Sequence, residues 1–269
     1  MNLKDRVAVV TGAGSGIGRA IALSLARRGA HLALADIDET GLAQTEAQAQ
    51  SAGARVSRHR LDVADRDAVA ALPGLVTQAH GRVDLLVNNA GVAVGGNFDQ
   101  VSEADFDWLM EINFHGLVRM TRAFLSLLRA SDDARIVNLS SVFGLISPPG
   151  SCAYSASKFA VRGFSNALGH ELAGTSVGVT VVHPGGVATA IAHNARLPQG
   201  VPDEELRRRV ALIEKNLRMP PEKAGEIIVR GIEKRRRRIL VGGDAVVFAL
   251  LERLAPVNYW RVLAPVYQK

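Results

Sequence analysis

The chain has 269 residues, of which 48% are hydrophobic and 22% are charged. These proportions are typical of a soluble globular protein and argue against extended disorder, and the length suits one α/β domain. The first residues lack the apolar core of a signal peptide, and the apolar run 245–251 is far shorter than the roughly 20 residues of a membrane-spanning helix. We therefore expect neither a secretion signal nor a transmembrane helix.

Cys152 is the only cysteine, so the chain cannot form an intramolecular disulfide. This favours a cytoplasmic location, and we expect the thiol to pack as a small apolar group. Lysine and arginine exceed aspartate and glutamate by 32 − 26 = 6, with much of the excess in the runs 207–209 and 234–238. Such runs bind anionic lipid or nucleic acid, but a solvated helix face explains them equally well. No aromatic stacking surface accompanies them, so we do not expect a nucleic-acid partner.

Short apolar runs alternate with longer helical segments along the first half of the chain. This alternation predicts a parallel sheet wrapped by helices. The first helix is expected from about Ile17 to Gly29. Seven strands are expected, at 6–10, 31–35, 55–61, 83–87, 135–139, 177–183 and 238–241. No linker or internal repeat divides the chain, so we expect one α/β domain.

The last third of the chain has a less regular pattern. Leu206, Val210, Ile213 and Leu217 have helical spacing and precede a pair of prolines, and a further helix is expected over 222–234. The tail 242–269 mixes aliphatic, aromatic and basic residues. It suits packing against the sheet as well as it suits an amphipathic flap, a subunit contact or a membrane-surface patch.

A glycine-rich turn follows the first strand and opens the first helix. The absence of side chains would let the backbone approach a pyrophosphate at the positive end of the helix. The common GxGxxG pattern is not matched, but the strand and helix on either side favour a phosphate site. The residues expected to contact the nucleotide here are Gly12, Gly14, Ser15, Gly16, Ile17 and Gly18.

Asp36 ends the second strand, where its carboxylate would accept hydrogen bonds from the adenosine ribose. A 2′-phosphate would meet this negative charge, and positions 15 and 37 hold serine and isoleucine rather than arginine. NAD is therefore preferred over NADP as the cofactor. The alternative is that Asp36 caps the next helix, although Asp38 lies nearer to it.

Tyr154 and Lys158 are four residues apart, which places both side chains on one face of a helix. A phenol with its ordinary pKa of about 10 is a poor proton carrier at neutral pH, and a cation beside it would favour the phenolate. Tyrosine and lysine one turn apart are more often surface neighbours. The pair is therefore an acid/base candidate only in the context of the rest of the chain.

Together these motifs resemble the short-chain dehydrogenase/reductase family over residues 5 to 190. The TGxxxGxG turn is matched by 11–18, the NNAG segment by 88–91, and the YxxxK pair by Tyr154 and Lys158. The serine thirteen positions before the tyrosine is Ser141, and the helix asparagine corresponds to Asn113. Pro184 and Gly185, followed by Thr189, are similar to the PGxxxT segment. The resemblance implies a Rossmann-type doubly wound domain.

The resemblance also implies roles for these residues. Tyr154 would exchange a proton with the substrate oxygen while hydride moves to or from the nicotinamide. Lys158 would hold the nicotinamide ribose and favour the phenolate, Ser141 would bond the substrate oxygen, and Asn113 would position a water behind Lys158. Further nucleotide contacts are expected from Asp62, Val63, Asn89, Pro184, Gly185, Val187 and Thr189. No metal site is expected.

The expected substrate is a hydrophobic secondary alcohol or ketone, of steroid-like, retinoid-like or long-chain type. By the resemblance it would lie under a lid at 186–219, near Ile191 and Phe143. Other apolar residues placed to line the pocket are Val94, Val142, Leu145, Ala190, Ala192 and Leu197. Their apolar character is equally consistent with core packing.

A homodimer through the helices that carry Asn113 and Lys158 is the family expectation. The family's tetramer-forming tail is replaced here by 235–243 and the extension 242–269, which would shield the pocket or lie on a membrane. Two other functions stay open: an NAD(H) sensor without turnover, and a peripheral membrane or nucleic-acid protein that uses the arginine runs. The intact set of Asn113, Ser141, Tyr154 and Lys158 favours the enzyme.

Overall fold

The fold is built on one parallel sheet. The computed structural model describes residues 1–198, 201, 204, 211, 215 and 217–267. Seven strands form a sheet in the order β3-β2-β1-β4-β5-β6-β7, and all neighbouring strands are parallel. The strands are β1 (Val7–Thr11), β2 (His31–Asp36), β3 (Val56–Arg60), β4 (Leu85–Asn88), β5 (Ala134–Leu139), β6 (Val177–Pro184) and β7 (Arg238–Val241).

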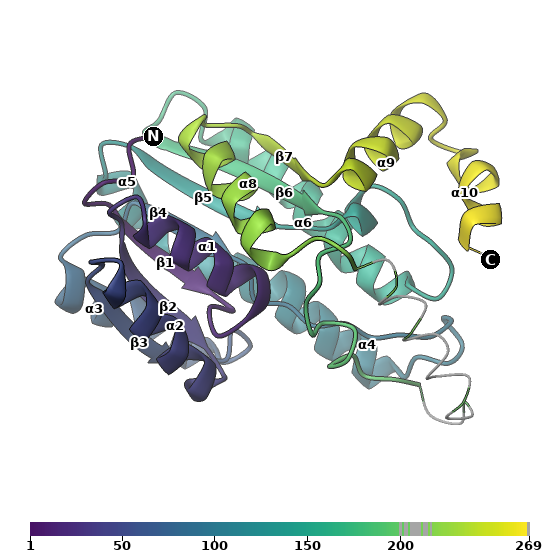
Figure 1. The fold of residues 1–269 in the computed structure, drawn as a ribbon, viewed down its shortest axis with the longest axis horizontal. Coiled ribbons are helices and arrows are strands. Elements are labelled where there is room, and N and C mark those ends of the chain that lie inside the picture. The colour runs from purple at the N-terminus through teal and green to yellow at the C-terminus, as the bar shows by residue number, and fades with distance from the viewer. Residues whose placement is uncertain (199–200, 202–203, 205–210, 212–214, 216, 268–269) are drawn as a thin grey trace.

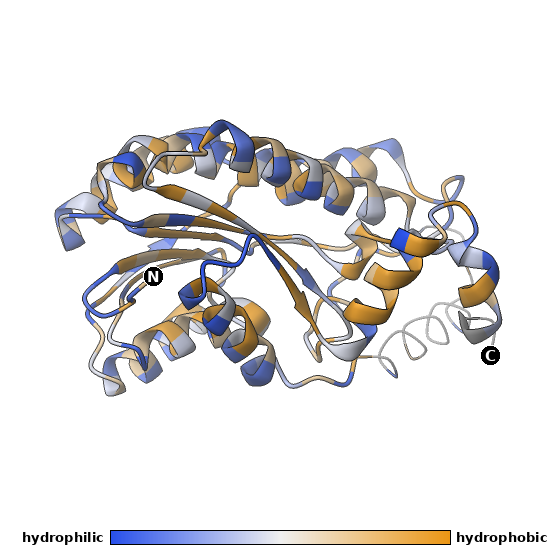
Figure 2. Cartoon of the chain, turned by 90° about the horizontal axis from the view of Figure 1, so that it is seen from above, coloured by the Kyte–Doolittle hydropathy of each residue, from blue (hydrophilic) through white to orange (hydrophobic). Residues whose placement is uncertain are grey.

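Helices cover both faces of this sheet (Figure 2). One face carries α1 (Gly16–Ala26), α2 (Glu39–Ser51) and α8 (Pro221–Glu233). The other carries α3 (Arg66–His80), α5 (Leu117–Ala130) and α6 (Cys152–Glu171). The remaining elements are α4 (Glu103–Met110), the π-helical turn η1 (Glu111–Gly116), the 3-10 turn η2 (Val142–Gly144), α9 (Gly243–Leu254) and α10 (Tyr259–Tyr267). Because the sheet is covered on both sides, the central strands β1, β4 and β5 are buried along their whole length rather than at alternating positions.

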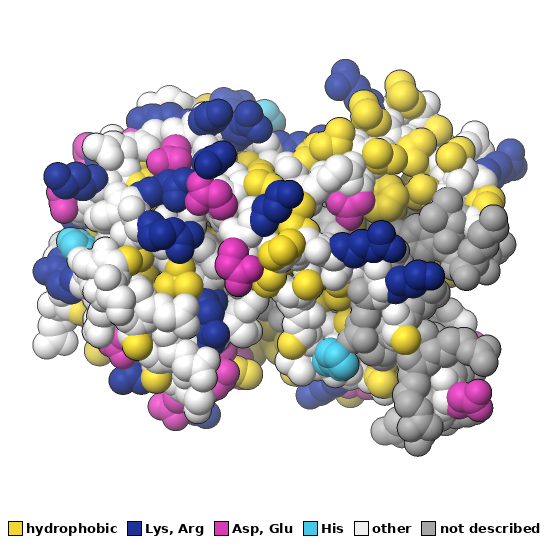
Figure 3. Space-filling model, viewed as in Figure 1, with side chains coloured by type: hydrophobic (Ala, Val, Ile, Leu, Met, Phe, Trp, Pro, Cys, Tyr) yellow, Lys and Arg dark blue, Asp and Glu magenta, His cyan; other side chains and the backbone are white. Residues whose placement is uncertain are grey.

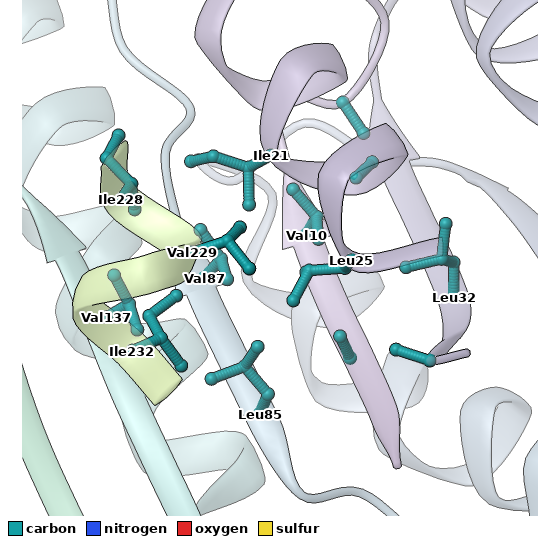
Figure 4. Packing of buried hydrophobic residues seen from close by; sticks show 14 of the residues in the cluster. Val10, Ile21, Leu25, Leu32, Leu85, Val87, Val137, Ile228, Val229 and Ile232 are labelled. Carbon is teal, nitrogen blue, oxygen red and sulfur yellow. The ribbon is translucent and has the colours of Figure 1, made fainter. Parts of the chain in front are cut away.

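Helices α1 and α8 pack together over the sheet (Figure 4). Ile21 of α1 and Ile228 of α8 are fully buried in the same apolar cluster as Val10 and Val87 of the strands. A Cβ on Gly225 would overlap the backbone of Ala20, so the glycine allows the two helices to approach closely. This contact fixes the start of α1, and with it the glycine-rich turn.

The strand order reverses at β1, which pairs with β2 on one side and β4 on the other. Successive connections on the two sides of this point run to opposite faces of the sheet, which opens a crevice beyond the carboxyl ends of the strands. The glycine-rich turn after β1 and Asn89 after β4 therefore lie at the same edge.

The predicted parallel α/β sheet is confirmed, and each strand begins and ends within two residues of its expected position. Residues 206, 210 and 213 of the helix predicted before the prolines lie outside the described residues.

Cys152 is exposed, so the expected packing role is wrong. The run 234–238 is exposed, and it leaves α8 and enters β7 instead of forming a helix face; the run 207–209 lies outside the described residues. Within the described ranges, no helix is long and apolar enough to cross a membrane.

The α1/α8 packing gives a stability prediction. Ile228 is 0% exposed, so Ile228→Ala would leave a cavity and lower the free energy of unfolding by about 2–5 kcal/mol. Leu75→Ala is the matched control, because Leu75 is 51% exposed on α3 and its loss should change stability by less than about 0.5 kcal/mol. Urea titration measures both. Equal effects of the two changes would contradict the assignment of this core.

Candidate active site

The glycine-rich turn is held in one shape by close backbone contacts. Gly12 and Gly16 have left-handed φ values of 65° and 51°, which glycine adopts without steric cost. A Cβ on Gly18 would overlap the Gly12 carbonyl oxygen. Ser15 is the N-cap residue of α1, but its side chain makes no capping hydrogen bond. The first backbone N–H groups of α1 are thus left for an anion at the positive helix end.

The Asp36 carboxylate is fixed against this turn. Its Oδ2 accepts from Gly14 N at 2.8 Å and its Oδ1 accepts from Asp38 N at 3.0 Å. Asp38 caps α2 by accepting from Gly41 N at 3.0 Å, so the interpretation of Asp36 as the cap is wrong. Asp36 therefore lies at the end of β2, with its carboxylate held beside the glycine-rich turn.

Arg19 is the arginine bonded to the same turn. Its Nε donates to Thr45 Oγ1 at 2.9 Å, and its Nη2 donates to the carbonyl oxygens of Gly14 and Gly41 and to Gln44 Oε1. The guanidinium is thus bonded to the turn and to α2. Arg19 forms no hydrogen bond with Asp36, whose carboxylate accepts from Gly14 N and Asp38 N.

Thr11 and Asn89 join the ends of β1 and β4. Thr11 Oγ1 accepts from the backbone N–H groups of Asn89 and Ala90, each at 3.0 Å, and donates to Val87 O at 3.3 Å. Asn89 Nδ2 donates to Thr11 O at 3.0 Å and to Gly12 O at 3.2 Å. The Asn89 side chain therefore holds the turn, at the same edge as Asp36.

Asp62 and Val63 follow β3 and have different surroundings. Asp62 is exposed and its Oδ1 accepts from Ala64 N at 2.8 Å. Val63 is 6% exposed, its carbonyl accepts from Arg119 Nη1 at 2.8 Å, and a Cβ on Gly116 would press against its side chain. Val63 thus packs under η1, and Asp62 lies on the open side of the same turn.

Tyr154 and Lys158 lie on the first turns of α6. Lys158 is 4% exposed, its Nζ donates to Leu139 O at 3.2 Å and lies 5.5 Å from the centroid of the Tyr154 ring. Desolvation lowers the pKa of Lys158 to about 8. It raises the pKa of Tyr154 to about 12, and a hydrogen bond from the Ser141 side chain acts in the opposite direction. The expected lowering of the phenol pKa by the lysine is therefore not met, because desolvation dominates and Lys158 is not among the groups that shift this pKa.

Ser141 follows β5 and caps η2. Its Oγ accepts from Phe143 N at 3.1 Å, so the hydroxyl proton is available to a further acceptor. The Phe143 ring meets the Tyr154 ring edge to face, with centroids 6.0 Å apart. The structure thus brings Ser141, Phe143 and Tyr154 together.

His183 lies behind Ser141, and no motif in the sequence pointed to it. The side chain is 0% exposed and Nδ1 is 2.9 Å from the Ser141 carbonyl oxygen. Desolvation lowers the pKa of His183 to about 4, so the ring is neutral and its Nδ1 must carry the proton that it donates to the carbonyl. His183 Nε2 has no partner among the described residues. The ring fixes the backbone of Ser141.

Asn113 lies in η1 and is 1% exposed. Its Oδ1 accepts from Val92 N at 2.8 Å, and its Nδ2 donates to Val92 O at 3.0 Å and to Ser157 Oγ at 3.2 Å. A Cβ placed on Gly91 would lie 3.1 Å from Asn113 Oδ1 and 3.5 Å from Lys158 Nζ. The missing side chain of Gly91 therefore leaves the Asn113 oxygen and the lysine ammonium facing one small space.

The segment after β6 returns to the glycine-rich turn. A Cβ on Gly16 would lie 3.1 Å from Thr189 Cγ2, which places Thr189 beside the turn. Val187 is 3% exposed and pairs with Met219. Gly186 N donates to Asp244 Oδ2 at 2.7 Å. Asp244 was not selected from the sequence, because its only local feature is that it follows two glycines.

The other expected pocket residues divide into buried and open positions. Ile191 is partly exposed, Ala190 is exposed and Leu197 is 42% exposed. Those that are buried are Val94, Val142, Leu145 and Ala192. Val94 belongs to a small apolar cluster against which Tyr154 packs. Among the described residues, no group of three or more His, Cys, Asp or Glu side chains is placed to hold a metal ion.

Comparison with known proteins gives a consistent result. Residues 6–200 match the family model described as short chain dehydrogenase. The chain is 45% identical over 266 residues to SadH of Mycobacterium tuberculosis, named as an oxidoreductase, with 98% of this chain and 95% of the relative covered. A short chain dehydrogenase/reductase from Burkholderia phymatum, solved in complex with NAD, is 34% identical with a TM-score of 0.88, covering 94% and 95% of the two chains. An alcohol dehydrogenase from Thermococcus sibiricus, complexed with 5-hydroxy-NADP, is 27% identical with a TM-score of 0.74, covering 88% and 95%.

The buried lysine gives a pH-dependent stability prediction. Below about pH 8, Lys158 is charged in the folded and the unfolded chain; between this value and its ordinary pKa of 10.5, only the unfolded chain keeps the proton. The unfolded state then binds more protons, so this lysine's contribution makes the free energy of unfolding rise with pH, by up to about 1.4 kcal/mol per unit.

Lys158→Met removes this contribution. We expect the variant to be more stable than the wild type near pH 7, and the difference to shrink as the pH rises toward 9.5, before Tyr154 begins to ionise. Urea titrations of both proteins across this range measure the difference. If the two proteins differed in free energy of unfolding by the same amount at every pH, the lysine would not be desolvated.

Proposed function

The chain belongs to the short-chain dehydrogenase/reductase family of NAD(P)-dependent oxidoreductases, and we propose that it interconverts a hydrophobic secondary alcohol and its ketone with NAD. The observation that carries the proposal is the meeting of Tyr154, Lys158 and Ser141 at the sheet edge that also holds the glycine-rich turn. A phenol, an ammonium and a hydroxyl donor beside a nucleotide site suit proton transfer to or from a substrate oxygen.

Each of the three side chains has a different role in the proposed reaction. With a pKa of about 12, Tyr154 keeps its proton at neutral pH and can deliver it to a carbonyl oxygen. Lys158, with a pKa of about 8, is still mostly protonated at pH 7 and supplies a fixed positive charge. The Ser141 hydroxyl accepts from Phe143 N and so donates its own proton to the substrate oxygen, where negative charge develops. A bound nicotinamide nucleotide supplies or takes up the hydride.

The space at Gly91 supports a route by which the proton is replaced. Asn113 Oδ1 and Lys158 Nζ border this space from two sides. A water there would accept from the ammonium and donate to the amide oxygen, which has a second lone pair. Asn113 would thus hold the water behind Lys158, and Tyr154 would regain its proton through Lys158.

The donor set fits a dinucleotide, and we propose NAD. The residues proposed to hold it are those of the turn 12–18, Asp36, Asp62, Val63, Asn89, Tyr154, Lys158, Pro184, Gly185, Val187 and Thr189. A 2′-phosphate near Asp36 would be repelled by its carboxylate, and the neighbouring Arg19 is bonded to Thr45 and to the turn.

Cofactor preference tests the role of Asp36. We expect the wild-type protein to bind NAD at least about tenfold more tightly than NADP. Asp36→Asn should lower this ratio of the two affinities by about tenfold, because it removes one charge repulsion of about 1.4 kcal/mol between the carboxylate and the 2′-phosphate. Calorimetric titration with both nucleotides measures the ratio. Asp133→Asn is the control, because it makes the same charge change beside Arg235 at the start of β5. An unchanged ratio in Asp36→Asn would refute the role of this carboxylate.

The proposed substrate is apolar because of the side chains around the reactive groups. Phe143 lies against Tyr154, and the cluster of Val94, Leu109 and Ala153 packs against the same tyrosine. Ile191 follows Thr189 on the segment 186–219, which we propose as the lid. Steroid-like, retinoid-like and long-chain alcohols all suit such a wall. We propose that residues 1–269 form one domain, with 242–269 as its C-terminal extension.

We propose a homodimer or homotetramer in the cytoplasm, with a membrane contact through the C-terminal extension. The partly buried apolar residues Leu125 and Leu127 of α5 and Phe164 of α6, with the exposed Phe159, support a subunit contact through these two helices. Burying them between two copies would remove apolar surface from water.

Tyr154→Phe tests the proposed reaction. It removes the hydroxyl and keeps the ring against Phe143, so we expect at least about a hundredfold loss of NAD reduction. The assay is a panel of steroid, retinoid and fatty secondary alcohols with NAD and NADP in parallel. The variant should still bind NAD, weakened by no more than the loss of one hydrogen bond. Unchanged turnover would refute the role of Tyr154, and NAD binding by the wild type without any turnover would favour a sensor.

A further inference from the structure

Helices α9 and α10 project from the body and carry an exposed apolar surface. Val246, Leu250 and Leu254 have four-residue spacing and so form one stripe along α9. Their exposed fractions are 45%, 53% and 79%. Val257, just past the end of α9, is 87% exposed, and Val262 of α10 is 57% exposed. We call the exposed apolar side chains of these two helices and the turn between them the outer face; they are Val246, Val247, Leu250, Leu254, Val257 and Val262. Figure 3 shows apolar side chains gathered here with basic side chains at the rim.

The other side of the extension is bonded to the body at three places. Asp244 accepts from Gly186 N at 2.7 Å, and Glu252 lies 3.6 Å from Arg162 of α6. Tyr259 Oη accepts from Ser147 N at 3.0 Å, on the loop that follows Ser141. The extension is therefore fixed beside the segments that carry the proposed reactive groups, and the outer face does not belong to an unattached tail.

The charges of the extension are arranged by sign. Asp244 and Glu252 are its only acidic residues, and both contact the body. Arg253 lies next to the stripe and Arg261 lies next to Val262, and both are exposed. The outer face therefore combines apolar side chains with positive charge. In a symmetric contact with a second copy, these arginines would meet the same face without an acidic partner on it.

We propose that the outer face docks on an anionic phospholipid surface. The valines and leucines would enter the boundary between headgroups and acyl chains, and Arg253 and Arg261 would bond lipid phosphates. Docking itself is independent of the reaction. One consequence rests on the proposed function: the membrane would lie next to the Ser141 loop, where an apolar alcohol could pass from lipid to the site.

Vesicle sedimentation of the full chain tests the docking. We expect binding to phosphatidylcholine vesicles that contain phosphatidylglycerol, weaker binding to phosphatidylcholine alone, and weaker binding as salt rises. The pair Leu250→Glu and Leu254→Glu should lower partitioning at least about tenfold, because charges replace inserted leucines. Arg253→Gln with Arg261→Gln should lower partitioning by roughly 25-fold at low salt, from about fivefold per arginine.

Leu75→Glu is the matched control, because Leu75 is a 51% exposed leucine on α3. It should leave partitioning unchanged. An equal loss in this control, or no binding of the wild type to anionic vesicles, would overturn the proposal. The proposal would also be overturned if the wild type did not bind vesicles and the two-glutamate variant had a different oligomeric mass from the wild type. The outer face would then be a subunit contact.

Failure of docking and failure of the proposed reaction are distinguishable. The two-glutamate variant should oxidise a short water-soluble secondary alcohol at the wild-type rate, and Tyr154→Phe should bind vesicles like the wild type. Vesicle binding without oxidation of any alcohol would leave the docking in place and refute the reaction. Oxidation of an alcohol without vesicle binding would refute the docking and leave the proposed reaction in place.

Discussion

The hydrogen bonds that join the ends of β1 and β4 are the constraint on which the site depends. Thr11 Oγ1 accepts from two successive backbone N–H groups of the β4 end, and Asn89 donates back to the β1 end. These bonds fix the crevice at the point where the strand order reverses, so that the glycine-rich turn, Asp36 and Gly91 lie along one edge. The strand pairing of β1 with β4 sets their separation, and these side-chain bonds extend that link beyond the strand ends to the glycine-rich turn.

Burial sets the chemistry at this edge. Desolvation moves the pKa values of Tyr154 and Lys158 toward the neutral form of each group, upward for the phenol and downward for the amine. The same low dielectric would strengthen the hydrogen bond proposed between the Ser141 hydroxyl and a substrate oxygen. His183 fixes the Ser141 backbone as a neutral ring, so it adds a donor without adding a charge.

The C-terminal extension has two different sides. Asp244 and Tyr259 bond to the loops after β6 and after β5, so the extension holds both loops that border the reactive groups. The opposite side exposes apolar residues beside two arginines. One segment thus connects the proposed docking surface to the proposed site, because its side chains accept hydrogen bonds from backbone N–H groups of both loops.

The sequence by itself determined the seven parallel strands, the glycine-rich turn and the spacing of Tyr154 and Lys158, because each is a local pattern of apolar runs, missing side chains or helical period. It also selected Ser141, Asn113 and Asp36, whose roles remain proposals. Only the tertiary structure placed His183 behind Ser141, Asp244 on Gly186, and Gly91 between Asn113 and Lys158. Those contacts join residues distant in the chain, so no local pattern encodes them. Burial likewise decided the direction of the Tyr154 pKa, because desolvation depends on how the whole chain packs around the phenol.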